Sequence, residues 1–253
     1  MPDEIYQPKN IPIFEAIYGR GLISLGGYPA VDNMLKNLDI TDKKLLDVGS
    51  GIGGMAHYIA QRYNAGVTGL EIRPWMAEHA LQQASDDIKD RVNFVIYNPD
   101  GTTPLPSEQY DVIYSKGVLT NISNKPILLA ELYRLLKPRG YLCLIDWLVP
   151  ESQGPKYEIL PMGDASYKET TNSYQKILTQ AGFTNISFQD NSDEYLEYVK
   201  LLDTKLQSKE HKTQFKSIIN NELRQELINS NHKLQLSIES HQQMSYLIRA
   251  CKS

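Results

Sequence analysis

The chain has 253 residues, 41% of them hydrophobic and 22% charged, which is enough apolar material for one good core and a small appendage. Its 26 basic and 30 acidic side chains give a net charge of −4 without any Lys/Arg-rich run, which argues against a nucleic-acid-binding surface. The cysteines Cys143 and Cys251 have no metal-ligand spacing, so no disulfide framework and no metal site is expected. We expect a cytoplasmic protein without membrane insertion, because neither a signal peptide nor a membrane-spanning apolar run is recognisable.

The N-terminal 40 residues predict a helical preface to a sheet. A helix-like stretch over Ile11–Tyr18 is followed by a glycine-rich loop at 19–27 and by a second amphipathic helix from about Tyr28 to Leu38. From residue 44 onward, strand-like runs alternate with helical patterns, and this alternation predicts a parallel, doubly wound sheet. The expected strands are Lys44–Val48, Gly66–Ile72, Val92–Tyr97, Tyr110–Ser115 and Gly140–Leu148, and the expected helices are Gly54–Tyr63, Pro74–Ala84 and Lys125–Leu136.

Beyond Pro150 the pattern loosens. A helix near Asn172 to Gln180 and a strand over Thr184–Gln189 precede a long, polar, helical segment at 193–228. That segment carries apolar residues at spacings of three to four, which predicts a lid or a buttress over the sheet; they are Tyr195, Tyr198, Leu201 and Leu202. The chain then ends on a strand-like run, Met244–Cys251.

The stretch Leu45–Gly54 is the most informative part of the chain, because an apolar strand there runs into a glycine cluster and then into a helix. Glycines 49, 51 and 54 allow a tight turn, close approach of the backbone to a ligand, and close packing of the helix on the strand. Ser50 lies within this turn. Glu71 ends the next apolar run, about where a ribose-binding carboxylate belongs. The order of these features predicts a nucleotide-cofactor site.

Asp47 bears on which cofactor binds, since the glycine pattern also fits a dinucleotide. A carboxylate at the mouth of the loop would repel a pyrophosphate and attract or tolerate a sulfonium. The segment resembles motif I of the class I S-adenosylmethionine (SAM)-dependent methyltransferases, which pair this acid with a second one a strand later. The alternative is that Asp47 only caps the loop and that Glu71 is a solvated strand end.

Further candidates for the cofactor slot lie after the later strands. Asp100 and Gly101 hold the position from which such enzymes offer an acid to the adenine amino group, with Ile72 also near the adenine; a plain turn is the alternative for Asn98–Gly101, which is rich in turn formers. Ser115 and Lys116 end the fourth strand beside the switch point of the sheet.

Several segments together resemble a narrower group, the phosphoethanolamine N-methyltransferases and the related sarcosine/dimethylglycine methyltransferases. The segments are Tyr6, Tyr18–Gly27, Leu45–Gly54, Asp111–Lys116 and Leu136–Gly140. The resemblance implies a Rossmann-like α/β fold whose seven-stranded sheet has an antiparallel last strand, with a helical cap inserted before that strand. On this basis we expect an N-terminal helical segment at 1–40, a SAM-binding core at 41–192, a cap at 193–243 and a final core strand at 244–253.

The resemblance also implies roles for two residues near the N-terminus. A tyrosine placed like Tyr6 closes over the active site, and a serine placed like Ser24 touches the methionine end of SAM, whose product is S-adenosylhomocysteine. For Tyr6, the alternative is an aromatic anchor on a frayed terminus.

Departures from that group limit the acceptor. Its catalytic histidine falls here on Asn121, whose amide cannot accept a proton near neutral pH. Where an arginine should hold a substrate phosphate, the sequence offers Asp164, so phosphoethanolamine itself is not the expected acceptor. Asp146, at the end of the fifth strand, could hold an amine or take its proton, with Trp147 stacking on the cation; a solvated strand end and a core aromatic are the alternatives.

The sequence therefore predicts a SAM-dependent methyltransferase acting on a small molecule, with an amine preferred, and a monomer or homodimer. The chemistry needs alignment of donor and acceptor and no metal. Two alternatives stay open, a non-catalytic SAM-binding protein and a nicotinamide-dependent reductase. The reductase, the less favoured of the two, would require a Tyr-x-x-x-Lys pair after the fourth strand; Tyr133 and Lys137 have that spacing and are followed directly by Pro138.

Overall fold

The computed structural model describes residues 5–159 and 165–253 of the chain. One large sheet is built from strands distributed along the whole chain: β1 (Lys44–Val48), β2 (Gly66–Glu71), β3 (Val92–Ile96), β4 (Tyr110–Lys116), β5 (Leu136–Leu148), β8 (Thr184–Asp190) and β9 (Met244–Cys251). Their order is β3-β2-β1-β4-β5-β9-β8. Pairing is parallel from β3 to β5, whereas β9 runs antiparallel to both β5 and β8. The predicted seven-stranded fold with an antiparallel last strand is confirmed.

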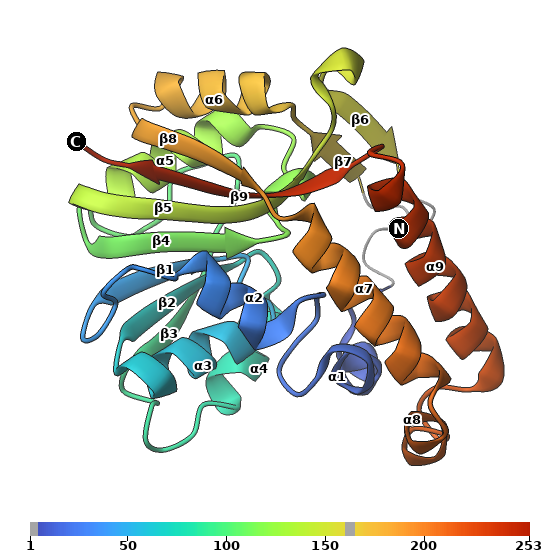
Figure 1. The fold of residues 1–253 in the computed structure, drawn as a ribbon. Coiled ribbons are helices and arrows are strands. Elements are labelled where there is room, and N and C mark those ends of the chain that lie inside the picture. The colour runs from blue at the N-terminus through green and yellow to red at the C-terminus, as the bar shows by residue number, and fades with distance from the viewer. Residues whose placement is uncertain (1–4, 160–164) are drawn as a thin grey trace.

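Helices cover both faces of this sheet (Figure 1). They are α1 (Ile11–Tyr18), α2 (Gly27–Met34), α3 (Gly54–Tyr63), α4 (Pro74–Gln82), α5 (Lys125–Leu135), α6 (Thr171–Gln180), α7 (Ser192–Gln207), α8 (Lys209–Gln214) and α9 (Asn221–Glu239). Leu45 packs with residues of α2 and α3, while its neighbour Leu46 packs with residues of α5 and α6. Both leucines are fully buried, as expected of a parallel strand that is covered on both faces.

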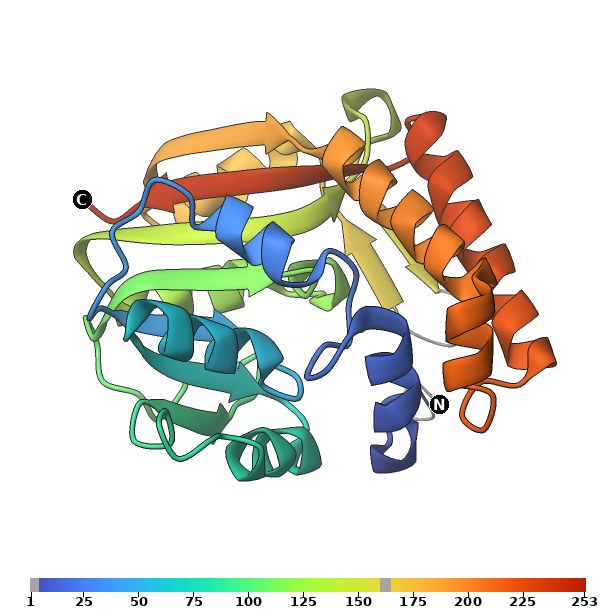
Figure 2. The same cartoon turned by 60° about the horizontal axis from the view of Figure 1, so that its bottom comes forward.

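Helices α7, α8 and α9 form the cap, which extends from one end of the sheet between β8 and β9 (Figures 1 and 2). Tyr195, Val199 and Leu206 face inward at helical spacing, but Leu201 is 64% exposed. Including Leu201 in the inward stripe was wrong, because six residues after Tyr195 the helix has turned it to the opposite side. The start and end of the cap are joined, since Asn191 N–H donates to Ser245 O (3.0 Å) and Ser245 N–H donates to Ser192 Oγ (3.1 Å).

The cap also holds the N-terminal helix. Lys205 Nζ donates to Ile17 O at 2.7 Å, and His211 Nε2 lies 2.9 Å from Ala16 O, so two carbonyls at the end of α1 gain partners from the cap. Figure 2 shows α1 beside the cap, across from the carboxyl ends of the central strands.

Several local features differ from the sequence prediction. The segment expected to be helical at 193–228 is three helices that extend to Glu239, and β5 begins at Leu136 rather than at Gly140. The second helix ends at Met34 rather than near Leu38, and Asn37 adopts a left-handed φ of 70°. A short hairpin of β6 (Lys156–Ile159) and β7 (Ala165–Lys168) was not anticipated, because four-residue strands carry little periodic signal. Over the described ranges, no helix combines the length and apolarity that crossing a bilayer requires.

Candidate active site

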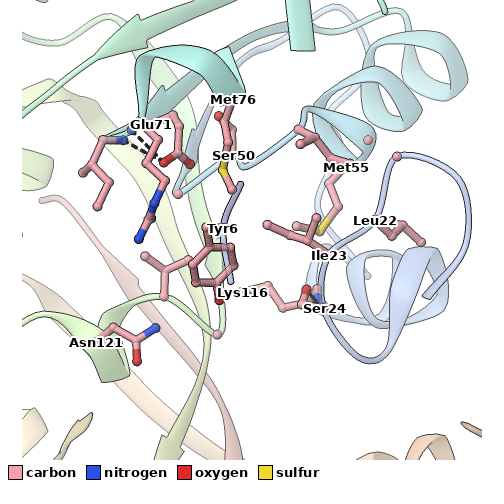
Figure 3. A pocket seen from close by; sticks show the side chains of 18 of the residues that line it. Tyr6, Leu22, Ile23, Ser24, Ser50, Met55, Glu71, Met76, Lys116 and Asn121 are labelled. Atoms are coloured by element: carbon pink, nitrogen blue, oxygen red, sulfur yellow. Dashed lines mark hydrogen bonds between the residues drawn. The ribbon is translucent and has the colours of Figure 1, made fainter. Parts of the chain in front are cut away.

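A cavity of about 320 Å³ lies at the carboxyl ends of β1, β2 and β4, where the strand order reverses. Open α/β sheets bind ligands at this position. Predicted site residues that line it come from the N-terminal segment and from the carboxyl ends of β1, β2 and β4 with the turns after them (Figure 3); they are Tyr6, Ser24, Gly49, Ser50, Glu71, Ile72, Lys116 and Asn121. Asp47, Gly51, Asp100, Gly101, Ser115 and Asp146 are not among the residues that line it.

Glu71 is 4% exposed and is held at the end of β2 by backbone donors. Its Oε1 accepts hydrogen bonds from Ile72 N (2.9 Å) and Arg73 N (3.0 Å), and its Oε2 accepts one from Gly51 N (2.9 Å). These charge-assisted bonds fix the carboxylate on the cavity wall and tie the glycine turn to it. Gly51 therefore supports the site through Glu71.

Glycine is required where the backbone turns beneath the cavity. Gly49 has a φ of 75°, and a Cβ there would collide with the Val118 side chain. A Cβ on Gly54 would collide with the backbone of Gly21, whose carbonyl accepts a hydrogen bond from Gly54 N at 3.1 Å. The N-terminal glycine-rich loop is thereby fastened to the glycine turn after β1.

Lys116 and Ser24 form a polar pair on another part of the wall (Figure 3). Lys116 Nζ donates to Ser24 Oγ (2.7 Å) and to Leu25 O (2.6 Å). Burial lowers the pKa of Lys116 to about 8, although the nearby Asp47 acts to raise it. This pair can hold a carboxylate of a ligand.

Asp47 lies beneath this wall, fully buried. It is paired with Gly69 of β2 and Tyr114 of β4 in the middle of the sheet and does not line the cavity, so the orientation of its carboxylate toward the mouth of the loop stays a prediction. No described group makes a well-formed hydrogen bond to either carboxylate oxygen. Burial raises the pKa of Asp47 to about 7, against the lowering effects of the Tyr114 hydroxyl and Lys116.

Tyr6 and Asn121 face the same cavity from different segments (Figure 3). The Tyr6 ring centroid lies 4.5 Å from Arg73 Cζ and 5.8 Å from the ring centroid of Phe14. Asn121 is exposed at the end of a 3-10 turn, Leu119–Asn121, where its backbone N–H donates to Val118 O at 2.8 Å.

Asp146 is buried behind that turn and has no access to the cavity. Its carboxylate accepts hydrogen bonds from Thr120 N (2.9 Å), from the Thr120 hydroxyl and from the Tyr174 hydroxyl (3.2 Å). Burial raises the pKa of Asp146, against the opposing charge of Lys125. Asp146 does not line the cavity and fixes the turn that presents Asn121, and its action on the acceptor stays a prediction. Trp147 packs edge-on against Tyr195 of the cap, with ring centroids 5.4 Å apart.

Two other predicted cofactor residues also have structural roles. Ser115 is buried, and its Oγ donates to Val48 O at 2.7 Å, which fastens β4 to β1. Asp100 is exposed in a local turn, in which Gly101 N donates to Asn98 O at 3.1 Å. The structure thus places the Asp100–Gly101 pair in the plain turn that its composition also allowed.

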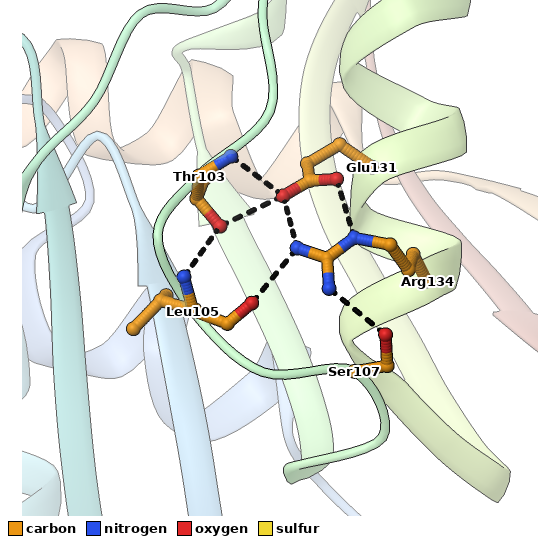
Figure 4. Close-up of polar contacts among 5 residues, drawn as sticks. All are labelled: Thr103, Leu105, Ser107, Glu131 and Arg134. Carbon is orange, nitrogen blue, oxygen red and sulfur yellow. Dashed lines mark hydrogen bonds and ion pairs between the residues drawn. The ribbon is translucent and has the colours of Figure 1, made fainter.

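The loop after that turn is pinned to α5 (Figure 4). Glu131 accepts hydrogen bonds from Thr103 N and Thr103 Oγ1, both at 2.7 Å, and pairs with Arg134 at 2.6 Å. Arg134 in turn donates to Leu105 O and Ser107 Oγ, both at 2.9 Å. Burial opposes ionisation of Glu131, but Arg134 and Thr103 hold its pKa below the ordinary value.

Sequence reasoning missed part of the lining. Arg73, Tyr97 and Ile122 each lie close in sequence to a predicted site residue, and that proximity was the available signal. Ala165 comes from the unanticipated hairpin. Asp164, which stands where an arginine was expected, lies outside the described residues. In the part of the chain that the structure describes, no three His, Cys, Asp or Glu side chains are grouped to hold a metal ion.

The central part of the chain is similar to known proteins. Residues 46–144 match a family model described as a methyltransferase domain. Phosphoethanolamine N-methyltransferase 3 of Arabidopsis thaliana is 30% identical over 198 residues, which are 77% of this chain and 40% of that protein. Glycine/sarcosine/dimethylglycine N-methyltransferase of Actinopolyspora halophila is 30% identical over 192 residues, covering 72% of this chain and 33% of that protein.

A solved structure extends the likeness to the whole fold. Haemonchus contortus phosphoethanolamine N-methyltransferase 2, in complex with phosphomonomethylethanolamine and S-adenosylhomocysteine, superposes with a TM-score of 0.86 at 20% identity, covering 99% of this chain and 59% of that one. The chain spans about two fifths of the length of the Arabidopsis relative. Together these matches confirm the resemblance inferred from the glycine turn and its flanking acids.

Proposed function

We propose that this chain is an enzyme that transfers a methyl group from SAM to a small amine. Its match to a methyltransferase domain and its class I methyltransferase fold support the proposal. One observation carries the proposal: Glu71 and the Lys116–Ser24 pair stand at separate parts of one cavity at the switch point of the sheet (Figure 3). A ligand that carries a diol and, some distance from it, a carboxylate matches that arrangement, and SAM has both.

The lining residues fit SAM group by group. Glu71 would accept the ribose hydroxyls, and Ile72 and Met76 would contact the adenine. Lys116 and Ser24 would hold the carboxylate of the methionine part. When bound, SAM supplies an electrophilic methyl group on a sulfonium sulfur and leaves as S-adenosylhomocysteine. Contact of Asp100 and Gly101 with the adenine remains a prediction, which requires their turn to move toward the cavity.

The acceptor would enter between Tyr6 and the turn that ends at Asn121. The Asn121 amide can donate or accept a hydrogen bond but cannot take a proton, so its role is to orient the acceptor nitrogen. The amine therefore arrives neutral or loses its proton to water. Relatives named for phosphoethanolamine and for glycine, sarcosine and dimethylglycine support an amine. An amine without a phosphate is the narrower proposal, because Asp164 replaces the expected arginine.

The reductase alternative has less support in the structure. Tyr133, the tyrosine considered for that chemistry, packs edge-on against Phe183 with ring centroids 5.2 Å apart and does not line the cavity. Cytoplasmic residence is also part of the proposal, and it is supported by Cys143 and Cys251, both of which are free thiols.

The experiment has two stages. Thermal unfolding with SAM, S-adenosylhomocysteine or NAD should show stabilisation by the first two ligands alone, because a ligand that binds only the native state raises stability by mass action. Methyl release is then measured over panels of amines, carboxylates and phenols. Turnover confined to amines supports the proposal, stabilisation by NAD alone contradicts it, and SAM binding without turnover on any panel favours the non-catalytic alternative.

A further inference from the structure

Arg73 brings a guanidinium group to the cavity two residues after Glu71. Its Cζ lies 4.5 Å from the centroid of the Tyr6 ring, within the range of a cation–π contact. Tyr6 also stacks on Phe14 of α1, with centroids 5.8 Å apart and planes inclined by 20°. The Tyr6 ring therefore has one partner on the sheet and another on the N-terminal helix.

Each of these partners is anchored to a different side of the cavity. The Arg73 backbone N–H donates to Glu71 Oε1 at 3.0 Å, so the guanidinium extends from a backbone fixed by the proposed ribose ligand. The N-terminal segment is folded on itself by Asn10 Nδ2, which donates to Ile5 O at 2.7 Å. The helix that follows is held by the cap through Lys205, which donates to Ile17 O. The contact between Tyr6 and Arg73 thus bridges the cofactor side and the cap side of the cavity.

We propose that Arg73 is a positioning residue that holds Tyr6 across the cavity, retaining the cofactor and shaping the space for the acceptor. The inference rests on the proposed function and adds a residue to it. A guanidinium suits this role because it is planar, always charged and weakly hydrated, so it stacks on an aromatic face better than an ammonium does. Loss of the contact between Arg73 and Tyr6 should shift the equilibrium between the closed and the released N-terminal segment roughly three- to tenfold.

The test uses a double-mutant cycle on the whole chain with two readouts. In the ligand-free protein, trypsin cleavage after the exposed Lys9 reports release of the N-terminal segment. Trypsin does not cut after Arg73 itself, because Pro74 follows it. In the complex, the dissociation rate of S-adenosylhomocysteine reports retention of the ligand. The variants are Arg73→Gln, Tyr6→Leu and the double variant, with Arg20→Gln as the matched control at an exposed arginine that does not line the cavity.

Each single variant should accelerate cleavage after Lys9 and dissociation of S-adenosylhomocysteine roughly three- to tenfold. The double variant should be no faster than either single variant. Tyr6→Phe should keep the wild-type rates because the ring remains, Arg73→Lys should rescue them in part, and Arg20→Gln should change neither. Once an acceptor has been identified, Arg73→Gln should raise the KM for that acceptor more than it lowers kcat.

Two results would overturn the inference: Arg73→Gln leaving both rates unchanged, or effects of the two substitutions that multiply in the double variant. Failure of the proposed function has a different signature. In that case S-adenosylhomocysteine does not bind, while the proteolysis cycle of the ligand-free protein still reports the contact between Arg73 and Tyr6.

Discussion

The cofactor side and the acceptor side of the cavity are assembled in different ways. The cofactor side comes mostly from one continuous unit, from β1 through the glycine turn and α3 to Glu71 at the end of β2. The acceptor side gathers Tyr6, Asn121 and Ala165 from three distant segments. The cofactor side is therefore set by the local geometry of a strand–helix–strand unit, whereas the acceptor side forms only after the whole chain has packed.

The largest effect is expected on the cofactor side. Glu71→Ala removes the carboxylate that accepts three backbone hydrogen bonds, and we expect SAM affinity to fall about 10- to 100-fold, since bonds to charged groups contribute about 1.5–3 kcal/mol. Isothermal titration measures this, with Glu78→Ala at an exposed position of α4 as the control. Unchanged affinity for SAM would contradict the assignment of this side.

Asp146→Ala should lower turnover, which depends on the acceptor side, without weakening SAM binding on the cofactor side. Thr120 would lose the buried acceptor of its N–H and hydroxyl, at a cost of about 1–3 kcal/mol in the free energy of unfolding. The turn carrying Asn121 would shift, and we expect turnover to fall about tenfold while SAM affinity stays within about twofold. Thermal unfolding, steady-state kinetics and titration of SAM measure the three quantities. Thr120→Val should reproduce the kinetic effect, and Asp193→Ala, at an exposed position, should not; a parallel loss of SAM affinity would show that the two sides are coupled.

Cofactor binding should depend on pH through Lys116. Burial lowers the pKa of Lys116 to about 8, so its ammonium is present below that pH and is lost as the pH rises through it. Because the protonated form holds the carboxylate, we expect SAM affinity to decline above about pH 8, by up to about tenfold per pH unit. Lys116→Arg should move the decline beyond pH 10, since a guanidinium keeps its proton. A flat profile for the wild-type chain would argue against Lys116 as the carboxylate ligand.

The smallest effect is expected at the turn after β3. Asp100→Ala should change SAM affinity less than about twofold, because an exposed carboxylate in a local turn contributes little to a cavity that it does not line. A tenfold loss in titration would instead show that the turn closes on the adenine, as its position in the sequence predicts.

The fold was largely predictable because its signals are local. The run Leu45–Val48 reads as a strand buried on both faces, and the glycines after it have few structural alternatives. Helix ends were less predictable: α2 stops at Met34 although apolar periodicity continues to Leu38, and the backbone is left-handed at Asn37.

The candidate site was predictable in part on both sides, since Tyr6 and Asn121 of the acceptor side also line the cavity. The positions of Glu71 and Lys116 follow from their places at strand ends, which parallel pairing brings to one edge. Asp146 occupies a similar strand end, yet Thr120 and Tyr174 cover it, and no spacing rule anticipates that cover. The contact between Arg73 and Tyr6 was missed because the two residues are far apart in the sequence, and a single chain gives no sign of such a contact.

The hydrogen bonds that join Asn191 and Ser192 to Ser245 close the neck of the segment that carries α7, α8 and α9. A segment whose two ends already meet within the sheet can be exchanged without asking the strands to move. The cap is therefore a self-contained insertion: exchanging it at the same neck would change how α1 is held through Lys205 and His211, while the site around Glu71 is left as it is.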